Sequence, residues 1–377
     1  MSVNARVALP ATALLTAIFC SGCSFGPVDS PFDSTQSDMG GKPADTTSIL
    51  KKLTKDVVIG STVDPINGDA GPRAISIVPK TYGPLTAGQL LVCNFNDEDG
   101  TAGAGTTIEL LKPAPSSQPT RFAQSSSIEG CDGDASIDKD AVYGSGLTSG
   151  EVVEFSDEGK IVGTYTGSPV ADPLSDVSAA QIEKYAPAYI FVGSTTSGSI
   201  TSISVGFYGT GKALRVAKGF AVQDAGSAQA LGPSGLQYDK QIDTLYIADG
   251  VTNTIVAFSH ASDLLEKDEI VVERGGKTFK CKNPKTTCAT LIYSGSPLAA
   301  PYAAALLPNG NLIVANTEGT ANTLVELTPQ GQILDTKVVD SNPTQGVYGL
   351  AAIGTNDSNT ALFFSDTNSN TLQELEQ

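Results

Sequence analysis

A recurring pattern of short strands constrains the fold of this chain more than any other feature. In each copy an apolar strand ends in a small residue followed by Asp, Asn or Ser, a polar turn comes next, and Thr or Gly precedes a second strand. Four copies are clear, and their strand ends are Asn94, Asp249, Asn316 and Asp366. Two weaker copies, at Ser145 and Ser194, lie between the first two of these. Six copies indicate a repeat architecture.

The copies recur at a nearly constant spacing. Successive strand ends are 51, 49, 55, 67 and 50 residues apart. Four strands with their turns occupy roughly 40–50 residues, so one repeat matches one four-stranded blade. We therefore predict an all-β fold, a single β-propeller of about six four-stranded blades. The 39 glycines and 21 prolines fit a fold with many turns.

A further strand precedes several copies, behind a Gly or Pro turn. These strands start near Pro233, Pro301 and Gly346 and are rich in small residues. We expect them to be the innermost strands, because bulky side chains do not fit around the axis. The last blade ends soon after Leu372, without a fourth strand. We predict that residues 56–60 pair with residues 371–375 and close the ring, which removes an exposed edge.

The repeat resembles the NHL-repeat family of six-bladed propellers. Blades of that family combine a Pro-x-Gly-apolar segment, an apolar-Ala-Asp segment and an Asn-x-apolar segment. Residues 233–236, 245–249 and 253–256 show the three segments in this order. The resemblance covers most of residues 65–377. It implies the architecture and says nothing of activity, since propellers host lyases, lactonases, sensors and scaffolds.

The N-terminus has the features of an export signal. Arg6 is the one charge before an apolar run from Val7 to Phe19, which is too short to span a membrane as a helix. The exit, Cys-Ser-Gly-Cys, resembles the lipobox of bacterial lipoproteins, which implies that Cys23 is lipidated. Cys20 stands where that family usually has Leu, so an ordinary cleaved signal peptide is the alternative.

These features divide the chain into three expected segments. Residues 1–22 are a lipoprotein signal peptide, residues 23–54 a flexible polar tether, and residues 55–377 the β-propeller domain. Ser24, rather than Asp, follows the lipidated cysteine, which in Gram-negative lipoproteins implies the outer membrane. We therefore expect a monomer anchored by lipid in the cell envelope. The net charge of −17 argues against nucleic acid as a partner.

Four cysteines remain in the body of the chain. In an exported protein they suggest two disulfides. Cys281 and Cys288 flank a hairpin-like loop and are the first expected pair, which leaves Cys93 with Cys131. A zinc site is the alternative, but these cysteines form no C-x-x-C pair and the chain has a single histidine.

Residues for catalysis or metal binding are few. His260 is the only histidine and is expected at the surface; no phosphate-binding Gly loop or G-x-S-x-G motif occurs. Two acidic clusters, residues 96–100 and 132–138, are weak calcium candidates. The second lacks the required glycine and has Tyr143 at the closing position. We expect solvated loops there and assign no catalytic residue, metal or cofactor.

The leading hypothesis is a non-catalytic binding or scaffold module for an envelope protein or a small-molecule ligand. The alternative is a divalent-metal-dependent hydrolase or lyase of the lactonase kind, which holds its ion in the central funnel. It would require the strand-end residues to converge on the axis, whereas we expect most of them to face turns; Asp239 is a further funnel candidate. A glycan binder ranks last, since Trp is absent and aromatic residues are 6%.

Overall fold

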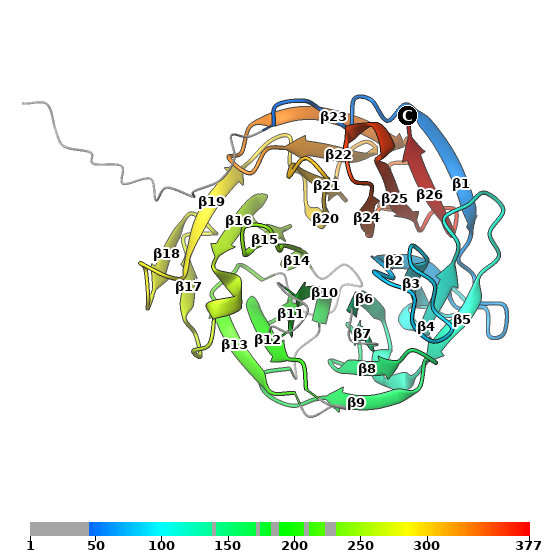
Figure 1. Ribbon diagram of the computed structural model, residues 1–377, viewed down its shortest axis with the longest axis horizontal. Coiled ribbons are helices and arrows are strands. Elements are labelled where there is room, and N and C mark those ends of the chain that lie inside the picture. The colour runs from blue at the N-terminus through cyan, green and yellow to red at the C-terminus, as the bar shows by residue number, and fades with distance from the viewer. Residues whose placement is uncertain (1–44, 138–140, 171–173, 182–187, 207–210, 223–230) are drawn as a thin grey trace, which may run out of the picture. The chain divides into compact units, whose positions relative to one another are not determined.

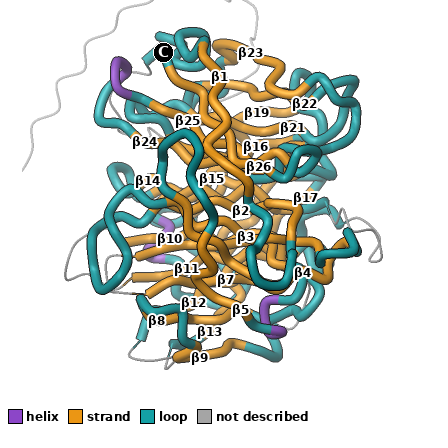
Figure 2. The backbone as a smooth tube through the Cα atoms, turned by 90° about the vertical axis from the view of Figure 1, so that its right-hand side faces the viewer, coloured by secondary structure: helices purple, strands orange, loops and turns teal. Residues whose placement is uncertain are grey.

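Six sheets, each built on four antiparallel strands, surround a common axis in the computed structural model of this chain (Figure 1). It describes residues 45–137, 141–170, 174–181, 188–206, 211–222 and 231–377. The fold is the predicted all-β propeller of six blades. Seen from the side, strands fill the middle of the domain and loops gather on its two faces (Figure 2).

Each blade begins with a strand at the axis and adds strands outward. Blade 1 contains β2 (Ala70–Ile77), β3 (Leu90–Asn96), β4 (Ala102–Leu111) and β5 (Thr120–Gln124). Blade 2 contains β6 (Cys131–Ile137), β7 (Ala141–Gly146), β8 (Val152–Ser156) and β9 (Ile161–Tyr165). Blade 3 contains β10 (Leu174–Gln181), β11 (Ala188–Ser194), β12 (Ser199–Ser204) and β13 (Ala213–Lys218).

The second half of the ring repeats this plan. Blade 4 contains β14 (Pro233–Asp239), β15 (Thr244–Asp249), β16 (Thr254–Ser259) and β19 (Cys288–Ser294). Blade 5 contains β20 (Pro301–Leu306), β21 (Leu312–Asn316), β22 (Asn322–Leu327) and β23 (Ile333–Asp340). Blade 6 contains β24 (Leu350–Ile353), β25 (Ala361–Asp366), β26 (Thr371–Glu376) and β1 (Lys55–Ser61).

Helices are short in the described part of the chain. They are the 3-10 turns η1 (Ser126–Ile128), η2 (Ala261–Asp263) and η3 (Asp357–Asn359). None of the described helices is long and apolar enough to cross a membrane.

The ring closes as the sequence predicts. β1 pairs antiparallel with β26, with Asp56 opposite Leu375 and Gly60 opposite Leu372. Figure 1 shows β1, in blue, as the outer strand beside the red β26. The two ends of the propeller domain are thus hydrogen-bonded in one sheet, where β1 covers the edge that β26 would otherwise expose.

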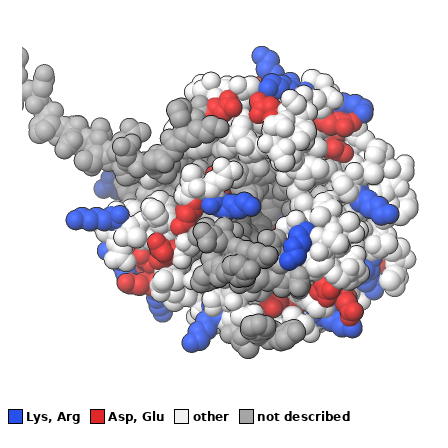
Figure 3. Space-filling view, in the orientation of Figure 1, with Lys and Arg blue, Asp and Glu red and all other residues white. Residues whose placement is uncertain are grey.

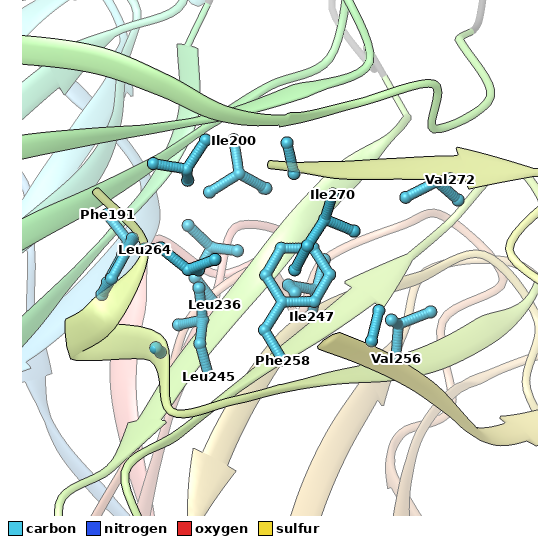
Figure 4. Close-up of a cluster of buried hydrophobic side chains, with 14 of the residues drawn as sticks. Phe191, Ile200, Leu236, Leu245, Ile247, Val256, Phe258, Leu264, Ile270 and Val272 are labelled. Carbon is cyan, nitrogen blue, oxygen red and sulfur yellow. The ribbon is translucent and has the colours of Figure 1, made fainter. Parts of the chain in front are cut away.

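The long interval between the fourth and fifth repeats contains an inserted hairpin. β17 (Ile270–Glu273) and β18 (Thr278–Cys281) join the sheet of blade 3, where β17 runs parallel to β13. Ile270 and Val272 of β17 are buried in a cluster with Phe258 of blade 4 (Figure 4). The extra residues therefore fill the outer junction between two blades.

Both expected disulfides are present, and each joins neighbouring sheets. Cys93 on β3 is bonded to Cys131 at the start of β6, which fastens blade 1 to blade 2. Cys281 at the end of β18 is bonded to Cys288 at the start of β19, which fastens the inserted hairpin to blade 4. The first pair is buried and the second is partly exposed.

The described end of the expected tether packs on the propeller instead of extending from it. Ile49, Leu50 and Leu53 are fully buried in a core cluster of blades 5 and 6. The buried Glu326 carboxylate on β22 accepts hydrogen bonds from the backbone N–H groups of Ile49 (3.1 Å) and Leu50 (2.9 Å). Residues 45–54 thus belong to the folded domain, because apolar burial and this acceptor hold them. Residues 23–44, with Cys23 and the signal peptide before it, lie outside the described residues.

Candidate functional site: the central cavity

The Asp side chains at the strand ends of the repeat accept hydrogen bonds from the backbone of the following turns, as the sequence analysis expects. Asp249 accepts from the backbone N–H of Val251 (3.0 Å), and Asp366 accepts from that of Asn368 (2.9 Å). Short Asp and Asn side chains commonly bond the backbone of a following turn in this way. These two carboxylates are therefore structural and do not converge on the axis.

The two amides at the same blade position bond neighbouring loops. Asn94 donates to the carbonyl of Thr62 (2.8 Å), and Asn316 accepts from the backbone N–H of Ala299 (3.0 Å). Asp239, the further funnel candidate, accepts from the backbone N–H of Gln241 (2.8 Å) in the β14–β15 turn and does not line the central cavity. His260 has a left-handed backbone conformation, just before η2, and is exposed.

A cavity of about 230 Å³ lies among the innermost strands of the blades. Its described walls come from β2, β6, β14, β20 and β24. The polar side chains that line it are Ser76, Asp132, Asp134, Ser136, Ser234, Gln237, Tyr302 and Tyr348. Figure 3 shows acidic and basic side chains interspersed around the face in view.

The two acidic clusters of the sequence differ in structure. Residues 96–100 form the β3–β4 turn, as expected of a solvated loop. Residues 132–138, also expected in a loop, instead belong up to Ile137 to the innermost strand β6, with Asp132 and Asp134 buried. The expectation was wrong because both side chains have polar partners in other blades that the local pattern does not show: Arg73 and Tyr302 for Asp132, and Ser76 for one oxygen of Asp134.

A buried ion pair forms the floor of the cavity. Arg73 on β2 donates to Asp132 (3.2 Å) and to the Tyr302 hydroxyl (3.2 Å), and Tyr302 in turn donates to Asp132. Burial works against the charged form of Arg73, but the Asp132 carboxylate together with Tyr302 and Tyr348 outweighs it, so the Arg73 pKa lies above its ordinary value. The floor is therefore a charged, internally neutral network.

Aromatic rings enclose the Arg73 guanidinium. Its central carbon lies 3.6 Å from the ring centre of Phe95 and 4.2 Å from that of Tyr348. Tyr302 and Tyr348 also pack edge to face, 5.0 Å apart. Cation–π attraction adds to the ion pair in such a desolvated place. All of these side chains are buried.

Asp134 stands in the cavity wall two residues further along β6. It accepts a hydrogen bond from the Ser76 hydroxyl through one carboxylate oxygen. The other oxygen, Oδ1, has no hydrogen-bond partner among the described residues. Burial raises the pKa of Asp134 to about 7. Near neutral pH this side chain can therefore exchange a proton.

Gly349 allows the inner strands to approach one another. A Cβ at this position would lie 2.1 Å from the carbonyl oxygen of Arg73, a clash with backbone. The Gly349 N–H donates to the Ser365 hydroxyl of blade 6 (2.8 Å). The glycine thus lets β24 pass close enough to β2 to seat Tyr348 on Arg73.

The described residues do not fit a resident divalent ion of the lactonase kind. No group of three or more His, Cys, Asp or Glu side chains within reach of one ion occurs among them. Among the described lining residues, Asp132 and Asp134 are the two carboxylates, and Asp132 is engaged by Arg73 and Tyr302. Calcium prefers six to eight oxygen ligands, which this set does not supply.

Comparison with known proteins shows the fold. No protein-family model and no curated protein matches the chain. A gluconolactonase from Xanthomonas campestris is similar in structure, with a TM-score of 0.55 and 10% identity over 89% of this chain and 95% of its own. A luciferin-regenerating enzyme gives a TM-score of 0.52 and 11% identity over 83% and 93%. At these identities the likeness extends to the propeller architecture alone.

Sequence reasoning missed the floor of the cavity. Arg73 was not singled out, although it is the one charge in the strand Ala-Gly-Pro-Arg-Ala-Ile-Ser-Ile. Alignment of the first strands of all blades would have placed it near Asp132 at the axis. Tyr302 lies in the first strand predicted to start near Pro301, but its partners are 229 and 170 residues away, so no local pattern reveals them.

Proposed function

We propose that this chain is an exported envelope protein, anchored by lipid at Cys23, whose propeller binds a small ligand in its central cavity. The observation that carries the proposal is the cavity itself. A neutral network closes its floor, and its wall presents polar groups that include Asp134. Concave sites with a few convergent polar groups are where proteins most often bind small molecules.

The cavity volume indicates the size of the ligand. About 230 Å³ lies below the range of roughly 300–1,000 Å³ that is typical of drug-sized ligands. The inner strands also turn backbone N–H and C=O groups of their free edges toward the axis, which suits a polar molecule. A compact, hydrogen-bonding ligand therefore fits better than an extended polymer or an apolar one.

A ligand screen tests this proposal. The full chain in detergent is screened by thermal shift against small cationic, neutral and anionic compounds. Ala352→Leu, in the cavity wall, narrows the site, and Ala87→Leu, in an exposed turn, is the matched control. We expect stabilising compounds whose effect is lost in the first variant and kept in the second. Hits that are indifferent to Ala352→Leu, or no hits at all, would refute the cavity as the site.

The envelope anchor has its own test. In a bacterial host, wild-type chain should partition with the outer membrane and carry acyl groups at Cys23, whereas Cys23→Ser should not be lipidated. An unmodified N-terminus at another residue would instead support an ordinary cleaved signal peptide.

A divalent-metal hydrolase of the lactonase kind is the second candidate. The likeness in fold to a gluconolactonase favours it, although the two carboxylates of the described cavity lining, Asp132 and Asp134, are fewer ligands than a divalent ion prefers. Elemental analysis, and melting with calcium, zinc or EDTA, tests it. A tightly bound ion whose removal lowers the melting temperature would lead to a screen of lactones and esters.

A further inference from the structure

We propose that the ligand of the central cavity is a compact organic cation, a protonated amine held beside Asp134. This rests on the proposed function, since it names the ligand class of the same cavity. The proposal begins from one side chain. Asp134 is 4% exposed, lines the cavity and has an Oδ1 atom without a partner among the described residues.

A buried carboxylate with an unmatched oxygen costs free energy. Buried polar groups in native proteins nearly always find a partner, and exceptions point to a missing proton, water or ligand. Ser76 is a neutral donor and satisfies only the other oxygen. A charged N–H donor would give this carboxylate a stronger, charge-assisted hydrogen bond than a neutral group does.

The net charge of the described cavity lining also favours a cation. Arg73 and Asp132 neutralise each other in the floor, and Tyr302 and Tyr348 are the other titratable side chains of the described lining. Ionised Asp134 therefore leaves the cavity with a negative charge that no described residue balances. The chain as a whole carries −17, and a negative protein draws cations toward its clefts.

Other polar groups of the wall suit an amine that carries a hydroxyl or a second donor. Ser136 and Gln237 line the cavity and are partly exposed, while the Ser136 hydroxyl lies 2.9 Å from that of Tyr82. Hydroxyl and amide oxygens accept hydrogen bonds from ammonium groups. A metal ion is disfavoured because the one available carboxylate of the described lining is too few, whereas an ammonium group needs only a few acceptors.

The proposal makes binding depend on pH in a defined direction. Burial raises the pKa of Asp134 to about 7, so its carboxylate is mostly ionised at pH 8 and mostly protonated at pH 6. A cation binds the ionised form. Affinity for an amine should therefore fall by about tenfold from pH 8 to pH 6, whereas a neutral ligand that accepts a hydrogen bond from protonated Asp134 would show the opposite trend.

Isothermal titration calorimetry on the full chain tests this inference. The probes are ethanolamine, choline and 1,4-diaminobutane as cations, glycerol as a neutral compound, glycolate as an anion, and calcium. We expect amine binding at pH 8 that weakens at least tenfold in Asp134→Asn. Asp99→Asn, in an exposed turn, removes the same formal charge and should leave affinity unchanged. Amine affinity of the wild-type chain is also measured from pH 8 to pH 6. This series needs no variant, so it tests the inference even if Asp134→Asn fails to fold.

The outcomes separate this inference from the proposed function. If glycerol, glycolate or calcium binds in preference to the amines, or if amine affinity is the same in Asp134→Asn, the ligand class is wrong while the cavity remains the site. If no probe and no compound of the wider screen binds, both proposals fail. Amine binding that is lost in Asp134→Asn and grows with pH supports both.

Discussion

The floor and the wall of the central cavity each contain an aspartate of the same strand, yet the two carboxylates differ in how many hydrogen-bond partners they have. Asp132 in the floor is bound by Arg73 and Tyr302. Asp134 in the wall accepts from Ser76 alone, and its Oδ1 has no described partner. A buried carboxylate whose oxygens all have hydrogen-bond partners stabilises the fold. A carboxylate with one unpartnered oxygen can still bind a ligand.

The difference has a geometric origin. Inner strands of a propeller are rotated copies, so that residues at equal heights face one another across the axis. At the height of Asp132, blades 1, 5 and 6 contribute Arg73, Tyr302 and Tyr348. At the height of Asp134, the described side chains of the lining are small or uncharged groups such as Ser76 and Ala304. Large side chains therefore fill the axis at the height of Asp132, whereas the cavity lies at the height of Asp134.

The largest expected effect comes from breaking the floor. Asp132→Ala leaves the Arg73 charge buried and unpaired, which should cost about 3–5 kcal/mol of the free energy of unfolding. Arg73→Met combined with Asp132→Asn removes both charges and should restore most of this loss. Urea unfolding followed by circular dichroism measures both. A loss under about 1 kcal/mol for Asp132→Ala would mean that the floor is not held by this pair.

Removal of the disulfide beside the floor should cause the next largest loss of stability. Replacing Cys93 and Cys131 by Ala releases a link across 38 residues, with an expected cost of about 4 kcal/mol. The same replacement of Cys281 and Cys288 opens a link across 7 residues at the rim and should cost about 2 kcal/mol. Urea midpoints of the two variants compare the axis with the rim, and equal losses would contradict the ranking.

Asp134 in the cavity wall should make the free energy of unfolding depend on pH. The native pKa of Asp134, about 7, exceeds its ordinary value of 3.8, so between these values the native state holds a proton that the unfolded state has lost. Stability then falls as pH rises through this window, by about 1.4 kcal/mol per pH unit. Asp134→Asn lacks this slope, so its advantage over wild type should grow by about 2 kcal/mol from pH 5 to pH 6.5. Parallel curves would contradict the raised pKa.

The smallest effect is expected at a buried acid away from the axis. Burial, and then the neighbouring Asp64 carboxylate, raise the pKa of Glu109 on β4 to about 9. Glu109 is therefore already neutral at pH 7, and Glu109→Gln should change stability there by less than about 1 kcal/mol. Wild type alone should lose stability as pH rises from the ordinary Glu value toward 9. A large loss in the variant at pH 7 would show that the acid is ionised.

Much of the fold could be predicted because its signals are local. The Asp or Asn at each strand end bonds the next few residues, so the hairpins of β15–β16 and β25–β26 are visible in short windows of sequence. The inserted hairpin β17–β18 was visible only as an overlong interval. Its place in the sheet of blade 3 depends on packing of Ile270 and Val272 with residues far along the chain.

The sequence by itself determined the period of the repeat, the closing strand and the cysteine partners, since strand alternation, turn chemistry and the count of cysteines express them directly. Only the tertiary structure decided which charges meet at the axis. Arg73, Asp132, Tyr302 and Tyr348 come from four blades and become neighbours when the ring closes. The same closure leaves Asp134 in the cavity wall, where Ser76 bonds one carboxylate oxygen and no described side chain bonds Oδ1.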